Sequence, residues 1–99
     1  MAVGKANGLR LYRLQAGLRQ EDVAELAGIT VATLSIAENG NLSTKTLLAL
    51  ARAYGVTLEQ LAADARVALY WVGGNPFPRL AEAERFARRT GVPVTEEKE

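Results

Sequence analysis

The sequence contains neither cysteine nor histidine. Disulfide bonds and thiolate metal sites are therefore excluded, and the commonest general base and metal ligand of proteins is missing. Gly73-Gly74 is followed by Asn75-Pro76 and not by a helix start with Lys and Ser or Thr, so it does not form a phosphate-binding loop. We expect no enzyme, no metal and no other cofactor, since no nucleophile–base pair or metal site is recognisable.

Long apolar runs are also absent. The longest, residues 67–72, is far too short to cross a bilayer. The first residues lack the charged start and the long apolar segment of a signal peptide. We therefore expect a cytoplasmic protein with no membrane partner.

The sequence also has almost no net charge. The chain has 12 basic and 11 acidic residues, which gives a formal net charge of +1. This balance argues against strong non-specific binding to nucleic acid. The length of 99 residues suits one small domain, or a compact domain with an appendage.

Residues 20–40 have the pattern of two short helices joined by a tight turn. Three apolar residues of the first helix share one face, namely Val23, Ala24 and Ala27. Gly28 suits the left-handed conformation that ends a helix, Thr30 is a good N-cap for the second helix, and Asn39-Gly40 is a strong stop. The spacing alone fits either a plain helical hairpin or a helix-turn-helix, which places its second helix in the major groove of DNA.

Three further helices are predicted around this pair. One covers residues 8–16 with Asn7 as its cap, a second begins after Ser43, and a short last one begins after Thr57. Their inward-facing apolar side chains, with those of the central pair, are enough for one core. They are Leu9, Tyr12, Leu18, Val23, Ile29, Leu34, Leu47, Leu50, Tyr54, Val56 and Leu61.

The chain is thus divided into a lead-in (residues 1–8), an all-α five-helix domain (residues 9–64) and an extension (residues 65–99). In the extension, residues 66–72 are rich in β-forming residues, and Gly73-Gly74-Asn75-Pro76 ends this strand. A helix follows from residue 78 or 79 to Thr90. Residues 92–94 form a short extended piece, and residues 96–99 a disordered tail.

An exposed single strand with aromatic side chains is prone to aggregation and has to be covered. We hypothesise that the strand or the final helix of the extension pairs with its symmetry mate in a homodimer. If residues 20–40 form a helix-turn-helix, such a dimer would place the second helices of its two copies about one turn of DNA apart. In the alternative, the strand and helix fold back onto their own five-helix core. The candidate dimerisation residues are Val67, Leu69, Tyr70, Trp71, Leu80 and Phe86.

Two short motifs carry a family resemblance. Residues 13–20 have the form Arg-x3-Gly-Leu-x-Gln, and Glu38-Asn39-Gly40 follows at the expected separation. The residues that match with them are Val23-Ala24, Ala27-Gly28-Ile29-Thr30, Leu34-Ser35, Leu47, Leu50-Ala51, Gly55-Val56 and Leu61. Over about residues 9–61 the chain therefore resembles the Cro and phage-repressor helix-turn-helix family, also called XRE-like. The resemblance implies a lambda-repressor-like fold that binds double-stranded DNA.

The resemblance also implies roles for single residues. Arg13 and Glu38 look like the family's buried ion pair, which ties the first helix to the end of the recognition helix. Gln20 and Asn39 look like contacts to the DNA backbone, although both also suit ordinary cap and turn roles. The cations best placed to flank this surface are Arg10, Arg19 and Lys45. Because they are few, the salt dependence of DNA binding by a monomer should be shallow.

The recognition helix departs from the family pattern. Its base-facing positions carry Val31, Ala32 and Ile36, with Thr33 and Ser35 beside them, and none is the Arg, Lys, Asn or Gln that makes bidentate contacts to bases. The apolar side chains can pack on thymine methyl groups, with a hydrogen bond from Thr33 and a contribution from DNA shape. Alternatively, this face binds a protein. In a third interpretation, Ile36 turns inward to fill the space beside the small Ala37.

From these observations we predict a prokaryotic or phage transcriptional regulator, more simply a repressor, that binds a short inverted repeat as a homodimer through the helix 31–38. Residues 41–47 are also similar to restriction-modification controller proteins, and small antitoxins share this fold. In those cases the apolar helix or the extension would hold a protein partner, such as a toxin. The alternative function is accordingly a protein-interaction module.

Overall fold

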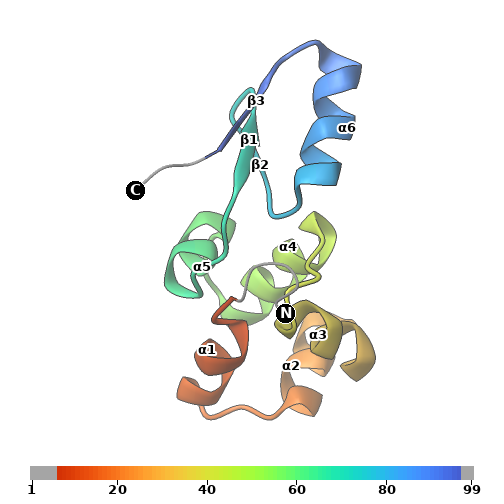
Figure 1. Cartoon of the computed structure of the whole chain (residues 1–99). Coiled ribbons are helices and arrows are strands. Elements are labelled where there is room, and N and C mark those ends of the chain that lie inside the picture. Colours follow the sequence, from red (N-terminus) through yellow and green to blue (C-terminus); the bar gives the residue numbers. More distant parts are fainter. Residues whose placement is uncertain (1–6, 97–99) are drawn as a thin grey trace.

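The computed structural model describes residues 7–96, in which a bundle of helices carries a small sheet and a further helix (Figure 1). The bundle consists of α1 (Leu9–Gln15), α2 (Gln20–Ala27), α3 (Val31–Glu38), α4 (Thr44–Tyr54) and α5 (Leu58–Asp64). The extension consists of β1 (Tyr70–Val72), β2 (Asn75–Phe77), α6 (Leu80–Thr90) and β3 (Val94–Glu96). None of the helices in this part of the chain is long and apolar enough to cross a membrane.

The predicted five-helix domain is confirmed. The extension differs from the predicted strand and helix, because it contains a three-stranded antiparallel sheet together with α6. The predicted tail is also wrong at Glu96, which pairs with Tyr70 as part of β3. The predicted lead-in at residues 1–6 and the rest of the predicted tail at residues 97–99 lie outside the described residues.

Three of the predicted helix caps are confirmed. In each, a side-chain hydroxyl at the N-cap accepts a hydrogen bond from a backbone N–H in the first turn, an interaction that stabilises a helix by about 1 kcal/mol. The pairs are Thr30 Oγ1 with Thr33 N–H (3.0 Å), Ser43 Oγ with Thr46 N–H (3.1 Å) and Thr57 Oγ1 with Gln60 N–H (3.0 Å). Side chains at three positions therefore set where α3, α4 and α5 begin.

The turn between α2 and α3 occupies only residues 28–30. Gly28 has φ +71° and ψ +31°, the left-handed conformation that costs an L-residue with a Cβ roughly 1 kcal/mol or more. The chain then returns at once, because Ile29 N–H donates to the Ala24 carbonyl oxygen at 2.9 Å and Thr30 caps α3. A glycine followed directly by a cap residue is thus what brings the two helices together.

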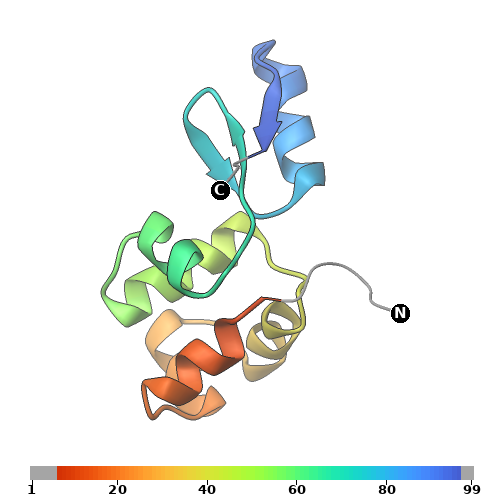
Figure 2. The ribbon, with the colours of Figure 1, turned by 60° about the vertical axis from the view of Figure 1, so that its left-hand side comes forward.

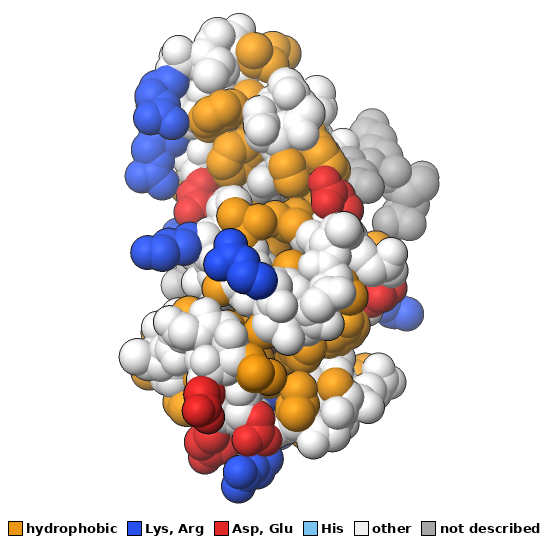
Figure 3. Space-filling view, turned by 180° about the vertical axis from the view of Figure 1, so that it is seen from behind, with side chains coloured by type: hydrophobic (Ala, Val, Ile, Leu, Met, Phe, Trp, Pro, Cys, Tyr) orange, Lys and Arg blue, Asp and Glu red, His pale blue; other side chains and the backbone are white. Residues whose placement is uncertain are grey.

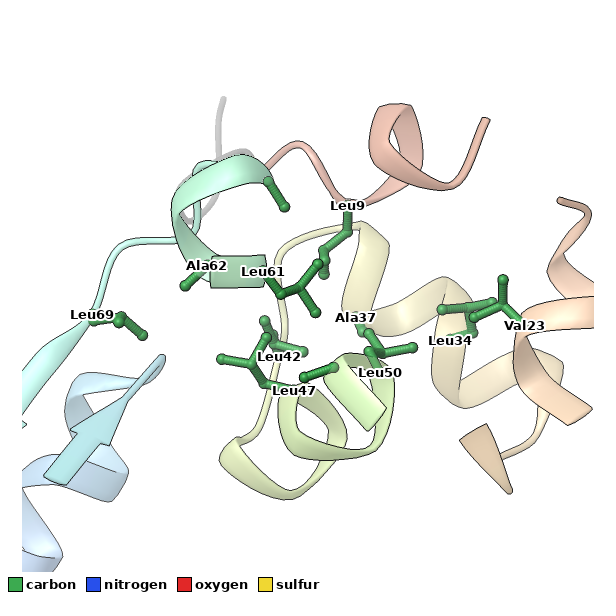
Figure 4. Close-up of a cluster of buried hydrophobic side chains, with 12 residues drawn as sticks. Leu9, Val23, Leu34, Ala37, Leu42, Leu47, Leu50, Leu61, Ala62 and Leu69 are labelled. Carbon is green, nitrogen blue, oxygen red and sulfur yellow. The ribbon is translucent and has the colours of Figure 1, made fainter. Parts of the chain in front are cut away.

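The core of the bundle contains the apolar residues that the sequence predicts (Figure 4). Each of them is either buried or packs against the buried cluster. Sequence analysis missed Leu42, in the loop after α3, and Leu69, just before β1, which are also buried there. Tyr12 and Tyr54 meet edge to face with ring centroids 4.8 Å apart, and so join α1 to α4.

The strand that the sequence predicts over residues 66–72 covers only Tyr70–Val72 in the structure. The glycines that were expected to end this strand form the turn of a β-hairpin. Gly73 and Gly74 have φ values of +57° and +86°, and Val72 pairs with Asn75 across them. Two consecutive glycines with positive φ are typical of the tight turns that join antiparallel strands. β1 therefore lies between β2 and β3, and its length is limited by the three residues that each neighbour offers.

The extension is fixed against the bundle by apolar and polar contacts. Trp71 packs against the core of the bundle. Within the extension, the Phe77 and Phe86 rings, 5.3 Å apart, join β2 to α6. One carboxylate oxygen of Glu82 in α6 accepts hydrogen bonds from the backbone N–H (3.0 Å) and the hydroxyl (2.8 Å) of Thr44. A carboxylate is stabilised at this helix start by the helix dipole. The first turn of α6 thus lies against the start of α4 (Figure 2).

Candidate nucleic-acid interface

The outer face of α3 is apolar and exposed. Val31 and Ile36 are 39% and 52% exposed, and Ala32 is exposed beside them, whereas Leu34 and Ala37 are buried. The interpretation that Ile36 turns inward is therefore wrong. Consecutive residues lie about 100° apart around a helix, so burying Ala37 in the core directs Ile36 away from it.

The polar residues of α3 lie at the edge of this face. Thr33 and Ser35 are half-buried. Thr33 Oγ1 accepts a hydrogen bond from the Thr30 hydroxyl at 2.9 Å. In this arrangement the proton of the Thr33 hydroxyl remains available for an acceptor outside the protein.

Arg13 and Glu38 form a buried ion pair that joins α1 to the end of α3. Arg13 Nε lies 2.7 Å from Glu38 Oε2, and Nη2 donates to Oε1 at 3.2 Å. The side chains are only 8% and 5% exposed. The hydrogen bond to Glu38 is the main reason why the pKa of Arg13 is raised, and burial acts in the opposite direction. The Arg13 guanidinium therefore keeps its charge in this buried position.

The ion pair is part of a larger network at the start of α2. Arg13 Nη1 also donates to the Leu18 carbonyl oxygen at 3.0 Å, and Gln20 Nε2 donates to Glu38 Oε1 at 3.2 Å. The network thus connects α1, the α1–α2 loop, the start of α2 and the end of α3. The family resemblance implies that Gln20 contacts the DNA backbone. Its hydrogen bond to Glu38 holds the Gln20 side chain at the start of α2.

Asn7 is a further contact that sequence analysis missed. The prediction treats it as a cap, and its Oδ1 does accept from Leu9 N–H at 3.1 Å. Its Nδ2 also donates to the Ala37 carbonyl oxygen at 3.1 Å, and so fixes the end of α3 from the start of α1. An asparagine before a helix signals only the first of these contacts, because the second joins residues that are remote in the sequence.

Most of the residues proposed as DNA-backbone contacts come together around one shallow hollow of about 430 Å³. The hollow lies between α1, the start of α2 and the end of α3. Among its lining residues are Arg10, Arg19, Gln20, Ser35 and Asn39. Lys45 is not among them, since it is exposed on the first turn of α4.

Arg19 is exposed at the rim of this hollow and makes an ion pair with Asp22 at 3.4 Å. The hydrogen bond to Asp22 raises the pKa of Arg19, and the hydrogen bond from the Arg19 backbone N–H lowers the pKa of Asp22. Exposed pairs of this kind contribute little to stability and rearrange easily. Arg19 can therefore leave Asp22 for a phosphate group.

The charges of the helical bundle balance. Residues 9–61 contain five Lys or Arg and five Asp or Glu, so that their net charge is zero. Figure 3 shows basic and acidic side chains next to one another at the end formed by α1 and α2. The bundle alone therefore offers little long-range attraction to a polyanion.

Most of the candidate dimerisation residues make contacts within their own chain. Leu69 belongs to the buried core, and Val67 and Trp71 pack against it, as the fold-back alternative expects. Phe86 packs on Phe77 of β2. Leu80, at the start of α6, is exposed, and Tyr70 is half-buried in the central strand.

Comparison with known proteins agrees with this geometry. A family model described as a helix-turn-helix matches residues 9–61, which run from the first residue of α1 into α5. The match covers more than half of the chain and leaves the sheet and α6 outside it. Comparisons with curated proteins and with solved structures found no match.

Proposed function

The chain belongs to the XRE-like helix-turn-helix family, and from this we propose that it is a sequence-specific regulator of transcription that reads double-stranded DNA with α3. The observation that carries the proposal is the exposed outer face of α3, held by the Arg13–Glu38 pair next to the hollow that contains Arg10, Arg19 and Asn39. A domain of this size blocks a promoter by occupying it, so repression is the simpler mode of action.

Val31 and Ile36 suit the recognition of thymine. The C5 methyl group of thymine is the one apolar feature that a base pair presents in the major groove. Exposed aliphatic side chains at the start and on the next turn of α3 can bury such methyl groups, and the Thr33 hydroxyl can donate to a base acceptor. Thymine methyl groups would thus cover the exposed apolar face of α3 in the complex.

Exchanging thymine for uracil in the bound half-site tests this contact, because it removes only the methyl group. Burying one methyl group is worth about 0.8 kcal/mol, so we expect the wild type to lose about fourfold in affinity for each contacted thymine. A Val31→Ala/Ile36→Ala variant should bind the thymine duplex more weakly and should respond little to the exchange. Fluorescence anisotropy titrations measure both effects. Equal wild-type affinity for the two duplexes would contradict methyl recognition.

The two edges of the sheet differ in their ability to pair with a second copy. In a two-residue hairpin the closing pair, here Val72 with Asn75, exchanges both hydrogen bonds. The next position in β2 is Pro76, which has no N–H to offer at the outer edge. Because hydrogen-bonded and non-hydrogen-bonded pairs alternate along an antiparallel ladder, the backbone N–H and C=O of Trp71 point toward Thr95 in β3. The backbone groups of Thr95 point back toward β1, and those of the neighbouring Val94 therefore point outward from the sheet. These features support a homodimer that pairs through β3.

A selection experiment tests the proposed regulator. Purified protein is incubated with random duplex DNA at physiological salt, and the retained DNA is sequenced. We expect an inverted repeat with half-sites about one helical turn apart. Val94→Pro removes an outward N–H of β3 and leaves the β1 pairing at Thr95 in place, so this variant should be monomeric by light scattering and should retain single half-sites.

Each result of the selection has a distinct meaning. If both the wild type and the Val94→Pro variant retain an inverted repeat, dimerisation through β3 is contradicted, but the proposed regulatory function is not. A single half-site from the wild type would contradict the homodimer. If neither protein enriches any sequence, the proposed function is wrong, and a protein partner for the apolar face of α3 should be sought by pull-down.

A further inference from the structure

Three arginines of α6 form an exposed cluster outside the region that the family model matches. Arg85, Arg88 and Arg89 follow one another at three- and four-residue spacing and therefore lie on one side of the helix. We call them the α6 arginine cluster. Figure 3 shows basic side chains in a column along the edge of the molecule where α6 lies.

The acidic residues of α6 do not neutralise this cluster. Glu82 is engaged with the backbone and hydroxyl groups of Thr44, at the opposite end of the helix. Glu84 is the other acidic residue of α6, so the exposed half of the helix keeps an excess of positive charge. The Arg89 guanidinium lies 5.7 Å from the centre of the Phe86 ring, which restrains its position.

The helical bundle needs cations from outside itself to bind DNA firmly. The net charge of residues 9–61 is zero, whereas most of the affinity of a protein for DNA comes from cations that neutralise phosphates. Outside this range the densest group of basic residues in the sequence is the α6 arginine cluster, with three in five positions. Guanidinium groups also match the geometry of phosphate oxygens better than ammonium groups do.

The position of α6 makes contact with flanking DNA possible. The Glu82–Thr44 contact holds the start of α6 against the start of α4, the helix that directly follows α3. In both ribbon views α6 and α3 lie on the same side of the molecule (Figure 1, Figure 2). The longest dimension of the molecule is 41 Å, which exceeds one turn of B-form DNA at about 34 Å.

We propose that the α6 arginine cluster binds phosphate groups of the DNA that flanks the half-site read by α3. This inference rests on the proposed DNA-binding function and assigns the extension a part in it. The cluster contributes affinity without sequence preference, because phosphates carry no sequence information. It compensates for the balanced charge of the bundle.

Salt-dependent binding tests the proposal. The wild type, an Arg85→Gln/Arg88→Gln/Arg89→Gln variant and two single variants, Arg88→Gln and Arg52→Gln, are titrated against a labelled 30-base-pair duplex between 50 and 200 mM NaCl. This duplex carries at its centre the half-site from the selection experiment. Each lost phosphate contact should lower the slope of log Kd against log salt by about 0.9. We expect a decrease of roughly 2 to 3 for the triple variant and roughly 1 for Arg88→Gln. Arg52→Gln, an exposed control in the bundle, should leave the slope unchanged.

An unchanged slope for the folded triple variant, or an equal decrease for Arg52→Gln, would overturn the proposal and identify the cluster as a solvated helix face. Circular dichroism confirms folding. If the wild type does not bind the 30-base-pair duplex at 50 mM NaCl, the proposed function itself is wrong. The two failures are therefore distinguishable.

Discussion

Replacing Glu38 with alanine is expected to lower the free energy of unfolding by about 3 to 5 kcal/mol. The change leaves the Arg13 guanidinium buried without its bidentate partner and removes the acceptor of the Gln20 amide. Small domains are stable by only about 5 to 15 kcal/mol in total, so the variant should be largely unfolded at moderate temperature. Urea denaturation followed by circular dichroism measures the loss.

Glu21→Ala is the matched control, since this glutamate is exposed in the first turn of α2. It should change the stability by no more than about 0.5 kcal/mol. A double variant, Arg13→Met/Glu38→Met, removes both charges together and should recover much of the loss. If Glu38→Ala costs less than about 1 kcal/mol, the ion pair does not hold α3 in place.

Replacing Ile36 with glutamate is expected to reduce the affinity for the selected DNA at least 100-fold while leaving the fold intact. Ile36 is 52% exposed, so the glutamate side chain remains in water in the free protein. In the complex its carboxylate would lie in the major groove, where it loses hydration and faces the negative potential of the phosphates. Anisotropy titrations measure the affinity, and thermal denaturation confirms the fold.

Leu26→Glu controls for the added negative charge. Leu26 lies on α2 and is 62% exposed, so this substitution changes the net charge equally at a comparable exposure. We expect its affinity for the selected DNA to fall only a few fold, through general repulsion. Equal losses in the two variants would show that charge alone acts, and that α3 does not enter the groove.

The sequence by itself determined the helical bundle and its turns. Thr30, Ser43 and Thr57 accept hydrogen bonds from residues three positions later, and Gly28 ends α2 within one turn. Such signals lie within a few residues of one another, so they can be read directly from the chain. The apolar periodicity of the helices likewise predicted which residues enter the core.

Tertiary structure decided the architecture of the extension. Gly73-Gly74 suits a hairpin turn, but the three residues of β2 include Pro76 and carry no strand pattern of their own. The pairing of β1 with β3 joins residues that lie more than 20 positions apart, with α6 between them. No local pattern specifies a partner at that distance, since the strands gain their hydrogen bonds only after the chain has folded back.

The candidate DNA surface divides in the same way. The exposure of Ile36 followed from the helical period, because burying Leu34 and Ala37 directs Ile36 outward. The exposure of Val31 did not, since it lies three residues before the buried Leu34. The hollow that gathers residues of three helices, and the Glu82–Thr44 contact that places α6 beside α4, arise only in the folded chain. Helical hydrogen bonds and caps are local and therefore visible in the sequence, whereas contacts between remote segments depend on how the helices pack.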